Sequence, residues 1–439
     1  MRIEQVEIYP NSWQKHGGSD YCMTATDAGD MLQVSGPDKT LFEGELVSDI
    51  KKTQCQSTDK AYKLCPLTVE NSKIIRELFD FTRPKSHKGH DITIGLGDRL
   101  GLASAGHIRT IKDLDVFPVL AQQSMRELNL TGRTYADVLS SATWAVFREG
   151  YIKGYGADGD HLKTHEEIKT ALDSGYTMIT LDCSEHIPLG LDAVVKFTAD
   201  VFNRHIRGKN IDFELSVDET QTVTTLEDHR YIARALKKED VDIVSLAPRF
   251  CGEFQKGIDY IGDIRQFEKE LEAHVKIADE YGYKISIHSG SDKFSIFPVI
   301  CRLTGGRYHL KTAGTSWLEA VRVIATYAPS LYRQLHTYAL ENLPEARKYY
   351  HISCDLSKIA ALDDTPDSRL PGYLNENDAR QVLHITYGLM LQSRNGDGTL
   401  RFRDRIYRLL NEYEPEYISA LEKHIGQHLT GLGIKKTGG

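Results

Sequence analysis

The stretch IDFELSVDETQTVTTLEDHRYIARALKKEDVDIVSLAP (211–248) contains a strand, a helix and a second strand in that order. IDFELSV (211–217) and DIVSLAP (242–248) are apolar runs of strand length. HRYIARALKKE (229–239), which lies between them, has the apolar spacing of an amphipathic helix. Strands joined through a helix in this way are typical of parallel βα units.

The same alternation begins near residue 75 and continues along the chain until eight candidate strands have appeared. These strands are DITIGLG (91–97), VFPVLA (116–121), YIKGYGA (151–157), YTMITLD (176–182), IDFELSV (211–217), DIVSLAP (242–248), KISIHSG (284–290) and RYHLKTA (307–313). Eight consecutive strand–helix repeats predict a closed (β/α)8 barrel of the TIM type.

Two further segments flank the predicted barrel, which we assign to residues 76–320. Residues 1–75 contain short extended stretches separated by clusters of Gly, Asp, Ser and Lys, which predict an N-terminal extension or small β-rich lobe. Residues 321–439 have helical patterns and predict a C-terminal helical addition packed on the barrel.

The main structural alternative is an open, doubly wound sheet that binds a dinucleotide. The turn GLGDRLG (95–101) tests it, because a dinucleotide fingerprint requires a third glycine where Leu100 stands. Asp98 would also face the pyrophosphate with a negative charge. The turn therefore disfavours a nucleotide site.

Composition narrows the class of protein further. The net charge of −8 argues against non-specific nucleic-acid binding, which requires a basic surface. We find no apolar run long enough to span a membrane and no secretory signal pattern. The seven cysteines are scattered without a C-x-x-C motif, which suits buried thiols in a reducing compartment. We therefore expect a soluble, cytoplasmic protein.

Three histidines lie at or near the predicted carboxyl ends of strands, where (β/α)8 enzymes place their chemistry. His161 falls in the loop after the third strand, His288 ends the seventh strand, and His309 lies in the eighth. Neutral imidazoles suit Zn, Mn, Ni, Co or Fe, so we predict a divalent metal site. Glu219 or Glu214 on the fifth strand is placed to complete it. The alternative for each histidine is a hydrogen-bonded structural role.

Carboxylates in the same loops are candidates for general acid–base catalysis. We select Asp98 and Glu253 as the catalytic pair. The alternative for Asp98 is a helix N-cap, and the alternative for Glu253 is a salt bridge with Arg249 or Lys256.

Cations in the predicted barrel mouth are candidates for holding a substrate carboxylate or phosphate. They are Arg99, Lys163, Arg249, Lys293 and Lys311. Lys293 is the first choice because it closely follows His288. Our set of substrate-binding candidates is Gln123, Glu219, Arg249, Lys293 and Lys311.

Seven stretches, matching in order from about residue 90 to 390, resemble the tagaturonate/fructuronate epimerases of bacterial hexuronate breakdown. They are ITIGLGDRLGLASAGHIR (93–109), QQSMRELNLTGRT (122–134), GYGADGDHLKT (154–164), FCGEFQKGIDYIGD (250–263), SIHSGSDKFSIFP (286–298), YHLKTAGTSWLEA (308–320) and DARQVLHITYG (378–388). The resemblance implies a metal-dependent isomerase that interconverts D-tagaturonate and D-fructuronate. Carried over by residue, it implies His161, His288 and His309 as metal ligands and Asp98 and Glu253 as the acid–base pair.

The expected partner is a small sugar acid rather than a nucleic acid or a membrane, and the oligomeric state and the identity of the metal stay open. One alternative function is a metal-dependent aldolase or sugar isomerase on a similar barrel. A second is an epimerase that prefers neutral ketohexoses, and a third is a non-catalytic carbohydrate-binding protein.

Overall fold

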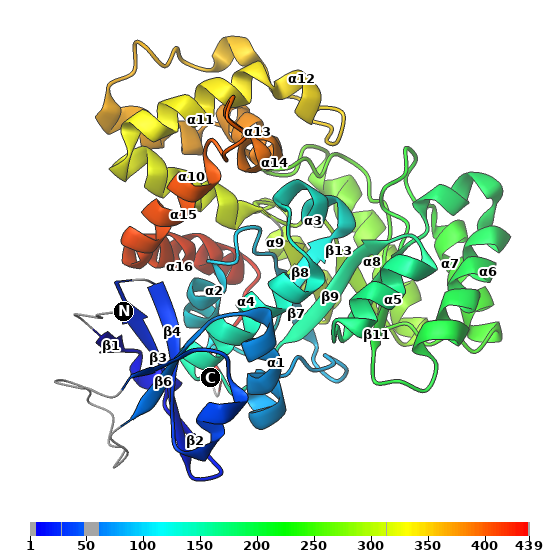
Figure 1. Ribbon diagram of the computed structural model, residues 1–439. Coiled ribbons are helices and arrows are strands. Elements are labelled where there is room, and N and C mark those ends of the chain that lie inside the picture. The colour runs from blue at the N-terminus through cyan, green and yellow to red at the C-terminus, as the bar shows by residue number, and fades with distance from the viewer. Residues whose placement is uncertain (1–5, 28, 48–60, 313, 438–439) are drawn as a thin grey trace.

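Eight parallel strands close into a barrel in the order β10-β11-β12-β13-β14-β7-β8-β9 (Figure 1). The computed structural model describes residues 6–27, 29–47, 61–312 and 314–437. The strands are β7 (Ile92–Leu96), β8 (Phe117–Ser124), β9 (Gly156–Leu162), β10 (Met178–Asp182), β11 (Asp212–Ser216), β12 (Ser245–Ala247), β13 (Lys284–Ile287) and β14 (Tyr308–Thr312). The barrel confirms the predicted fold class and excludes the open, doubly wound sheet. Ala313, the predicted end of the eighth strand, and Cys55 lie outside the described residues.

Helices follow the strands and form the outer layer of the barrel (Figure 1). They are α2 (Ser104–Ile111), α3 (Met125–Thr131), α4 (Tyr135–Glu149), α5 (His165–Asp173), α6 (Leu191–Val201), α7 (Leu226–Lys238), α8 (Ile264–Tyr281) and α9 (Phe297–Thr304). Helix α10 (Thr315–Tyr327) follows β14, but its buried residues pack with those of the C-terminal helices described below. Threonine caps begin α4, α5 and α7, and in each case the third helical residue closes a capping box.

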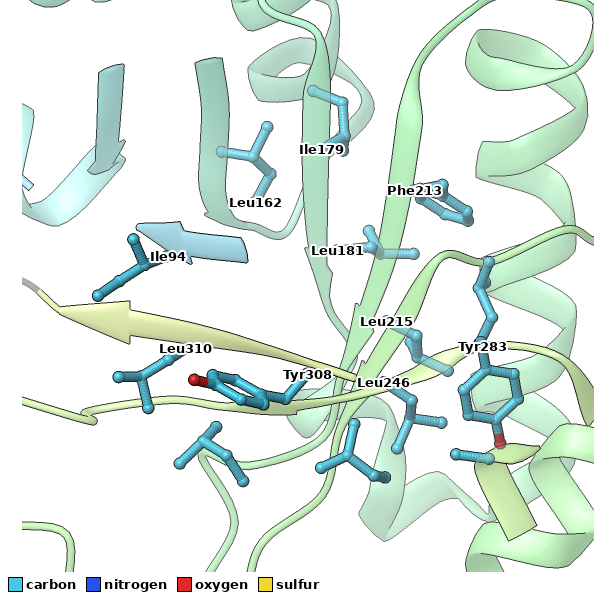
Figure 2. Packing of buried hydrophobic residues seen from close by; sticks show 14 of the residues in the cluster. Ile94, Leu162, Ile179, Leu181, Phe213, Leu215, Leu246, Tyr283, Tyr308 and Leu310 are labelled. Atoms are coloured by element: carbon cyan, nitrogen blue, oxygen red, sulfur yellow. The ribbon is translucent and has the colours of Figure 1, made fainter. Parts of the chain in front are cut away.

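The strand side chains that face the helices are apolar and form the main core. Figure 2 shows Ile94, Leu181, Leu215, Leu246 and Leu310 among them, and all five are fully buried. The opposite face of the strands is polar. Side chains of β9, β11 and β14, which do not all pair with one another, meet through ion pairs inside the barrel. TIM barrels usually fill this space with branched apolar residues, so the charged interior is a specific feature of this chain.

The third strand lies further along the chain than the sequence pattern predicts. We expected YIKGYGA (151–157) as this strand and His161 in the loop behind it, but β9 covers Gly156–Leu162 and includes His161. The prediction was wrong because ADGD has low β-propensity and its polar side chains face the barrel interior. The pairing of β9 with β10 shifts by one residue between Ile179 and Leu181, which places a bulge at Asp160 and His161.

An antiparallel sheet precedes the barrel, with strand order β1-β3-β4-β6-β5 and β2 paired to β3 (Figure 1). Its strands are β1 (Val6–Ile8), β2 (Gln14–His16), β3 (Ser19–Thr26), β4 (Gly29–Ser35), β5 (Glu45–Val47) and β6 (Tyr62–Pro66). Helix α1 (Val69–Leu78) follows. Trp144 and Phe147 of α4 belong to the same apolar cluster as Tyr21 and Leu32 of the sheet, so this small lobe packs on the barrel.

Helices beyond the barrel form the predicted C-terminal addition (Figure 1). They are α11 (Pro329–Glu341), α12 (Leu343–Ala346), α13 (Asn377–Ile385), α14 (Tyr387–Gln392), α15 (Arg403–Glu412) and α16 (Glu414–Gly431). The segment boundaries we placed at residues 75 and 320 stay predictions. Helix α16 contacts α2 and α10, which joins the addition to the barrel. Among the helices described, none has the length and apolarity that crossing a membrane requires.

Candidate active site

A cavity of about 580 Å³ lies where the barrel strands end. Its lining combines strand-end residues, the loop after β12 and three residues of the C-terminal addition. The lining residues used below are Glu127, Asp160, His161, Asp218, Glu219, Arg249, Glu253, Gln255, Lys256, His288, Ser289, Lys311, Tyr349, Tyr350 and His351. The position matches the catalytic end of (β/α)8 enzymes.

Three of these side chains bring potential ligand atoms together. His161 comes from the bulge of β9, Asp218 lies two residues beyond β11, and His288 directly follows β13. Nε2 of His161 lies 3.3 Å from Oδ1 of Asp218. Nδ1 of His288 lies 3.2 Å from the same oxygen and 3.2 Å from Nε2 of His161. The three atoms therefore form a nearly equilateral triangle on the cavity wall.

This triangle fits a divalent cation. Ligand atoms about 2.0–2.1 Å from a tetrahedral zinc-like ion lie about 3.3 Å from one another, which is close to the observed spacing. Two imidazoles and one carboxylate suit zinc and other first-row metals. A site with three protein ligands leaves a position for a substrate oxygen.

The surrounding charges show that this position favours a cation. Burial would raise the pKa of Asp218, but His288 and His161 outweigh it and hold that pKa well below its usual range. Burial lowers the pKa of His161, but Asp160 and Asp218 outweigh it and raise the pKa well above its usual value. The same balance raises the pKa of His288 beside Asp218 and Glu214. Positive charge, carried by protons or by a metal ion, is therefore stabilised here.

Unusual backbone conformations occur at two cavity residues, His161 and Ser289, and nearby in the chain at Asp292. Four non-glycine residues of the described chain have positive φ, and three of them are His161 (φ 53°), Ser289 (φ 49°) and Asp292 (φ 60°). Such conformations cost about 1–3 kcal/mol each and occur preferentially at functional sites.

His309 does not join the other two predicted metal ligands. It is fully buried, its Nδ1 lies 2.7 Å from the hydroxyl of Thr93, and its ring stacks on His87. His309 is the second residue of β14 and Lys311 is the fourth, so His309 lies closer to the amino end of the barrel. Among the described residues, the potential metal ligands at the cavity are His161, His288 and Asp218, and not His309.

The two predicted catalytic carboxylates have different surroundings. Asp98 is buried and accepts hydrogen bonds of 2.7–3.2 Å from the backbone amides of residues 101–104, at the start of α2. It is not among the described residues that line the cavity. The N-cap residue of α2 is Ala103, so Asp98 is not the N-cap itself but binds the amides that lead into the helix. Glu253 lines the cavity, and its carboxylate lies 3.9 Å from Arg249.

The five candidate substrate-binding residues also divide. Arg249, Glu219 and Lys311 line the cavity, whereas Gln123 and Lys293 are fully buried outside its described lining. Gln123 donates to the carbonyl of Asp98 at 3.1 Å.

Lys293, our first choice for binding the substrate carboxylate, instead forms hydrogen bonds within the protein. Its ammonium donates to the carbonyls of Gln255, Ile258 and Ser291 at 2.6–3.0 Å. Burial lowers the pKa of Lys293 to about 7. We correct its role to fastening two loops together.

A second group, Asp292, His424 and His428, also has metal-ligand spacing, but its contacts indicate a structural role. Nε2 of His428 accepts the backbone amide of Asp292 at 2.9 Å, and its Nδ1 lies 2.9 Å from the carbonyl of His424. Both ring nitrogens of His428 are thus engaged, and the carboxylate of Asp292 binds Arg380 at 2.9 Å.

Comparison with known proteins places this chain in a family. The sequence model of the UxaE tagaturonate epimerase family matches residues 9–192 and 189–432. The chain belongs to the UxaE tagaturonate epimerase family. It is similar to the tagaturonate/fructuronate epimerase of Thermotoga maritima, with 36% identity and 96% of both chains covered.

Solved structures of this family agree with the fold. A glycerol complex of the fructuronate-tagaturonate epimerase UxaE from Cohnella laeviribosi is 45% identical, covers 98% of this chain and 97% of its own, and superposes with a TM-score of 0.92. The native crystal structure of the same protein gives 44% identity, the same coverage and the same TM-score. Family membership supports the predicted isomerase class and the epimerase interpretation over the aldolase or sugar isomerase.

Several residues of this UxaE-family site escaped the sequence analysis. Asp218 lies beside Glu219, which we had selected, but strand alternation from Asp212 through Glu214 to Ser216 puts Asp218 on the inward side. That periodicity was sufficient to find it. No local pattern marks Lys256 or the segment Tyr349–His351 as cavity residues, because their position depends on loop packing.

Proposed function

We propose that this protein is a metal-dependent epimerase that interconverts D-tagaturonate and D-fructuronate. The observation that carries the proposal is the His161–Asp218–His288 triangle facing the cavity of a UxaE-family chain. These three residues would hold the divalent cation, and zinc, manganese, nickel, cobalt and iron all suit the donor set.

The substrate chemistry limits the possible mechanism. In the 5-keto-uronates the inverted carbon, C3, is β to the ketone at C5. Enolisation acidifies only the carbons next to the ketone, C4 and C6, so removing a carbon-bound proton there does not invert C3. A β-hydroxy ketone can instead undergo retro-aldol cleavage. A base removes the proton of the C3 hydroxyl, the C3–C4 bond breaks, and its electron pair passes into the C4–C5 unit to give an enediolate and an aldehyde.

Reversal with the opposite face of the aldehyde completes the inversion. The aldehyde group turns over, the C3–C4 bond forms again, and an acid protonates the new C3 oxygen. A bound divalent cation supplies Lewis-acid stabilisation of negative charge on substrate oxygen. The enclosed cavity has to retain both fragments and exclude water.

Inversion moves the C3 oxygen from one side to the other, so one proton-transfer group is required on each side. We propose Glu253 as one of them because it lines the cavity. Asp98 is withdrawn, since its carboxylate binds the backbone amides of residues 101–104 and is not among the described residues that line the cavity. Glu127 and Glu219 also line the cavity and are our candidates for the second group.

We propose Lys256 as the residue that binds the substrate carboxylate. It lines the cavity and donates to the hydroxyl of Ser289, next to His288, at 3.0 Å. Within the described chain no carboxylate forms an ion pair with it, whereas Lys311 is bound to three. A cationic side chain that has no carboxylate partner in the protein can form an ion pair with the carboxylate of the substrate.

We place the reaction in the cytoplasm. Of the six cysteines that the structure describes, all except Cys301 are buried. Scattered, buried cysteines without a C-x-x-C motif suit a reducing compartment.

NMR analysis of turnover in D2O tests the function and the mechanism together. Tagaturonate should give fructuronate of equal mass without deuterium at C3, because the C3 hydrogen never leaves its carbon. Stable cleavage fragments would indicate an aldolase, and a moved carbonyl group would indicate an isomerase. Deuterium at C3 that keeps pace with epimerisation would refute the retro-aldol route. Faster turnover of fructose or tagatose would assign the enzyme to neutral ketohexoses.

A further inference from the structure

Lys311 lies at the centre of the charged barrel interior. It is 3% exposed, and its ammonium lies 2.7 Å from Asp158, 2.7 Å from Asp160 and 3.0 Å from Glu214. It also contacts the hydroxyl of Thr180. An ammonium group has three hydrogens to donate, so these partners use its capacity. Lys311 is therefore poorly placed to bind a substrate carboxylate, although it borders the cavity.

Two of its carboxylate partners support the two histidines of the candidate metal centre. Oδ1 of Asp160 lies 2.8 Å from Nδ1 of His161, and Oε1 of Glu214 lies 2.8 Å from Nε2 of His288. The other ring nitrogen of each histidine faces Asp218 in the ligand triangle. Each histidine thus has one nitrogen on a supporting carboxylate and one on the metal position.

A carboxylate behind a metal-binding histidine fixes the ring orientation and the tautomer. Here both supporting carboxylates bind the same ammonium group. We propose that Lys311 is a positioning residue, which holds Asp160 and Glu214 in place and thereby aligns His161 and His288 for the metal. This inference rests on the proposed metal centre.

The charges explain why a cation is needed behind the histidines. Asp158, Asp160 and Glu214 are all buried and all approach one point. Without Lys311, like charges would repel one another in a poorly solvated space, and the carboxylates would move apart. That displacement would release the two rings. Asp158 contacts Lys311 and Thr180, so it contributes negative charge to the network. Only the other two carboxylates, Asp160 and Glu214, contact the histidines.

Metal titration of the metal-free full-length protein tests the proposal without relying on activity. Lys311→Met should weaken Co²⁺ and Zn²⁺ binding by about 10- to 100-fold, the usual effect of losing such support. It should also change the visible absorption spectrum of bound Co²⁺, because the two imidazoles lose their fixed orientation. A general loss of stability would not produce a changed spectrum in the folded, metal-loaded fraction.

Lys284→Met is the matched control. Lys284 is also a buried lysine of the barrel, on β13, but it donates to the carbonyl of His90 and the hydroxyl of Thr93. This variant should bind Co²⁺ as the wild type does. If Lys311→Met does not fold, Asp160→Asn and Glu214→Gln each remove the charge of one supporting carboxylate and should each weaken binding, with a larger loss in the double variant.

The possible results separate the two proposals. A wild-type protein without a stoichiometric metal site would overturn the metal centre and this inference together. Wild-type binding with equal or tighter binding in Lys311→Met would overturn only the positioning role, since loss of a nearby positive charge alone would favour a cation. If Asp160→Asn and Glu214→Gln are used instead, unchanged metal affinity in both variants would likewise overturn only the positioning role.

Discussion

At the scale of single residues, Lys256 and Lys293 show how surroundings decide what a lysine can bind. Burial lowers the pKa of both. Lys293 is fully buried and fully engaged with backbone carbonyls, whereas Lys256 borders the cavity beside His288 and Ser289. The loss of the two lysines should therefore have different effects.

We expect Lys256→Met to raise KM for tagaturonate by about tenfold or more, the usual effect of losing a charge-assisted hydrogen bond. KM for a neutral ketohexose should change little, because that substrate has no carboxylate. Lys293→Met, the control, should lower thermal stability and affect both substrates alike. Steady-state kinetics on both substrates distinguish these outcomes, and equal losses in Lys256→Met would remove its recognition role.

Asp98 and Glu253 give a second residue-scale prediction. Asp98→Asn keeps one acceptor oxygen but loses the charge at the start of α2, so it should lower the free energy of unfolding by about 1–2 kcal/mol. Its kcat should stay within a few-fold of wild type. Glu253→Gln should instead lower kcat by about 100-fold or more in both directions, because each proton-transfer group is a base one way and an acid the other. Urea unfolding and kinetics measure both, and a severe kcat loss confined to Asp98→Asn would reverse the assignment.

At the scale of elements, the C-terminal addition supplies one wall of the cavity, the segment Tyr349–His351. Gln255, in the loop after β12, connects this wall to the barrel. Its side-chain oxygen accepts hydrogen bonds from the amide and hydroxyl of Ser353 at 2.8 and 2.9 Å, and from Gln381 of α13 at 2.8 Å. Gln255 belongs to the loop that carries Glu253 and Lys256. It therefore ties the segment Tyr349–His351 to this loop.

Gln255→Ala should detach this wall, because it leaves buried donors unsatisfied at a cost of about 1–3 kcal/mol. We expect a several-fold rise in KM and faster proteolytic cleavage near residues 347–353. Gln266→Ala serves as the control, since Gln266 makes an exposed contact with Glu270 on α8. Unchanged proteolysis in Gln255→Ala would show that other contacts hold the wall.

At the scale of the whole molecule, buried neutral histidines make stability depend on pH. Burial lowers the pKa of His229 to about 3, and of His274, His336 and His428 to about 4. Their unfolded-state pKa is about 6.5, so between about pH 4 and 6.5 the unfolded chain binds more protons. The stability they contribute is complete above pH 6.5 and is lost as the pH falls toward the folded-state values.

Each such histidine should reduce the free energy of unfolding by about 1.4 kcal/mol between pH 7.5 and 5.5. The urea midpoint should therefore fall over this range, and His336→Gln should fall less steeply than wild type. His336 is a suitable position because it is not among the described residues that line the cavity and it contacts Tyr332 and Tyr373. Parallel slopes for the two proteins would show that His336 is charged in the folded state.

The amino-acid sequence by itself determined the (β/α)8 class, because strand and helix periodicities follow from side-chain chemistry along the chain. It also placed His288 at the carboxyl end of its strand, since KISIH continues the alternation of a buried strand. It did not determine the position of β9 or the orientation of His161. The bulge there depends on how β9 pairs with β10, and local propensity does not encode that pairing.

Only the tertiary structure decided which polar groups share the cavity. His309 and Lys311 both lie on β14 and face the barrel interior, but at different depths. His309 therefore contacts Thr93, whereas Lys311 contacts the carboxylates. The sequence positions of Asp98, Gln123 and Lys293 suit site residues. In the structure, however, their side chains form hydrogen bonds with backbone amides or carbonyls. Lys256 and the Tyr349–His351 wall reach the site through packing between segments far apart in the chain. Contacts of this kind depend on the whole fold, so local sequence patterns leave them undetermined.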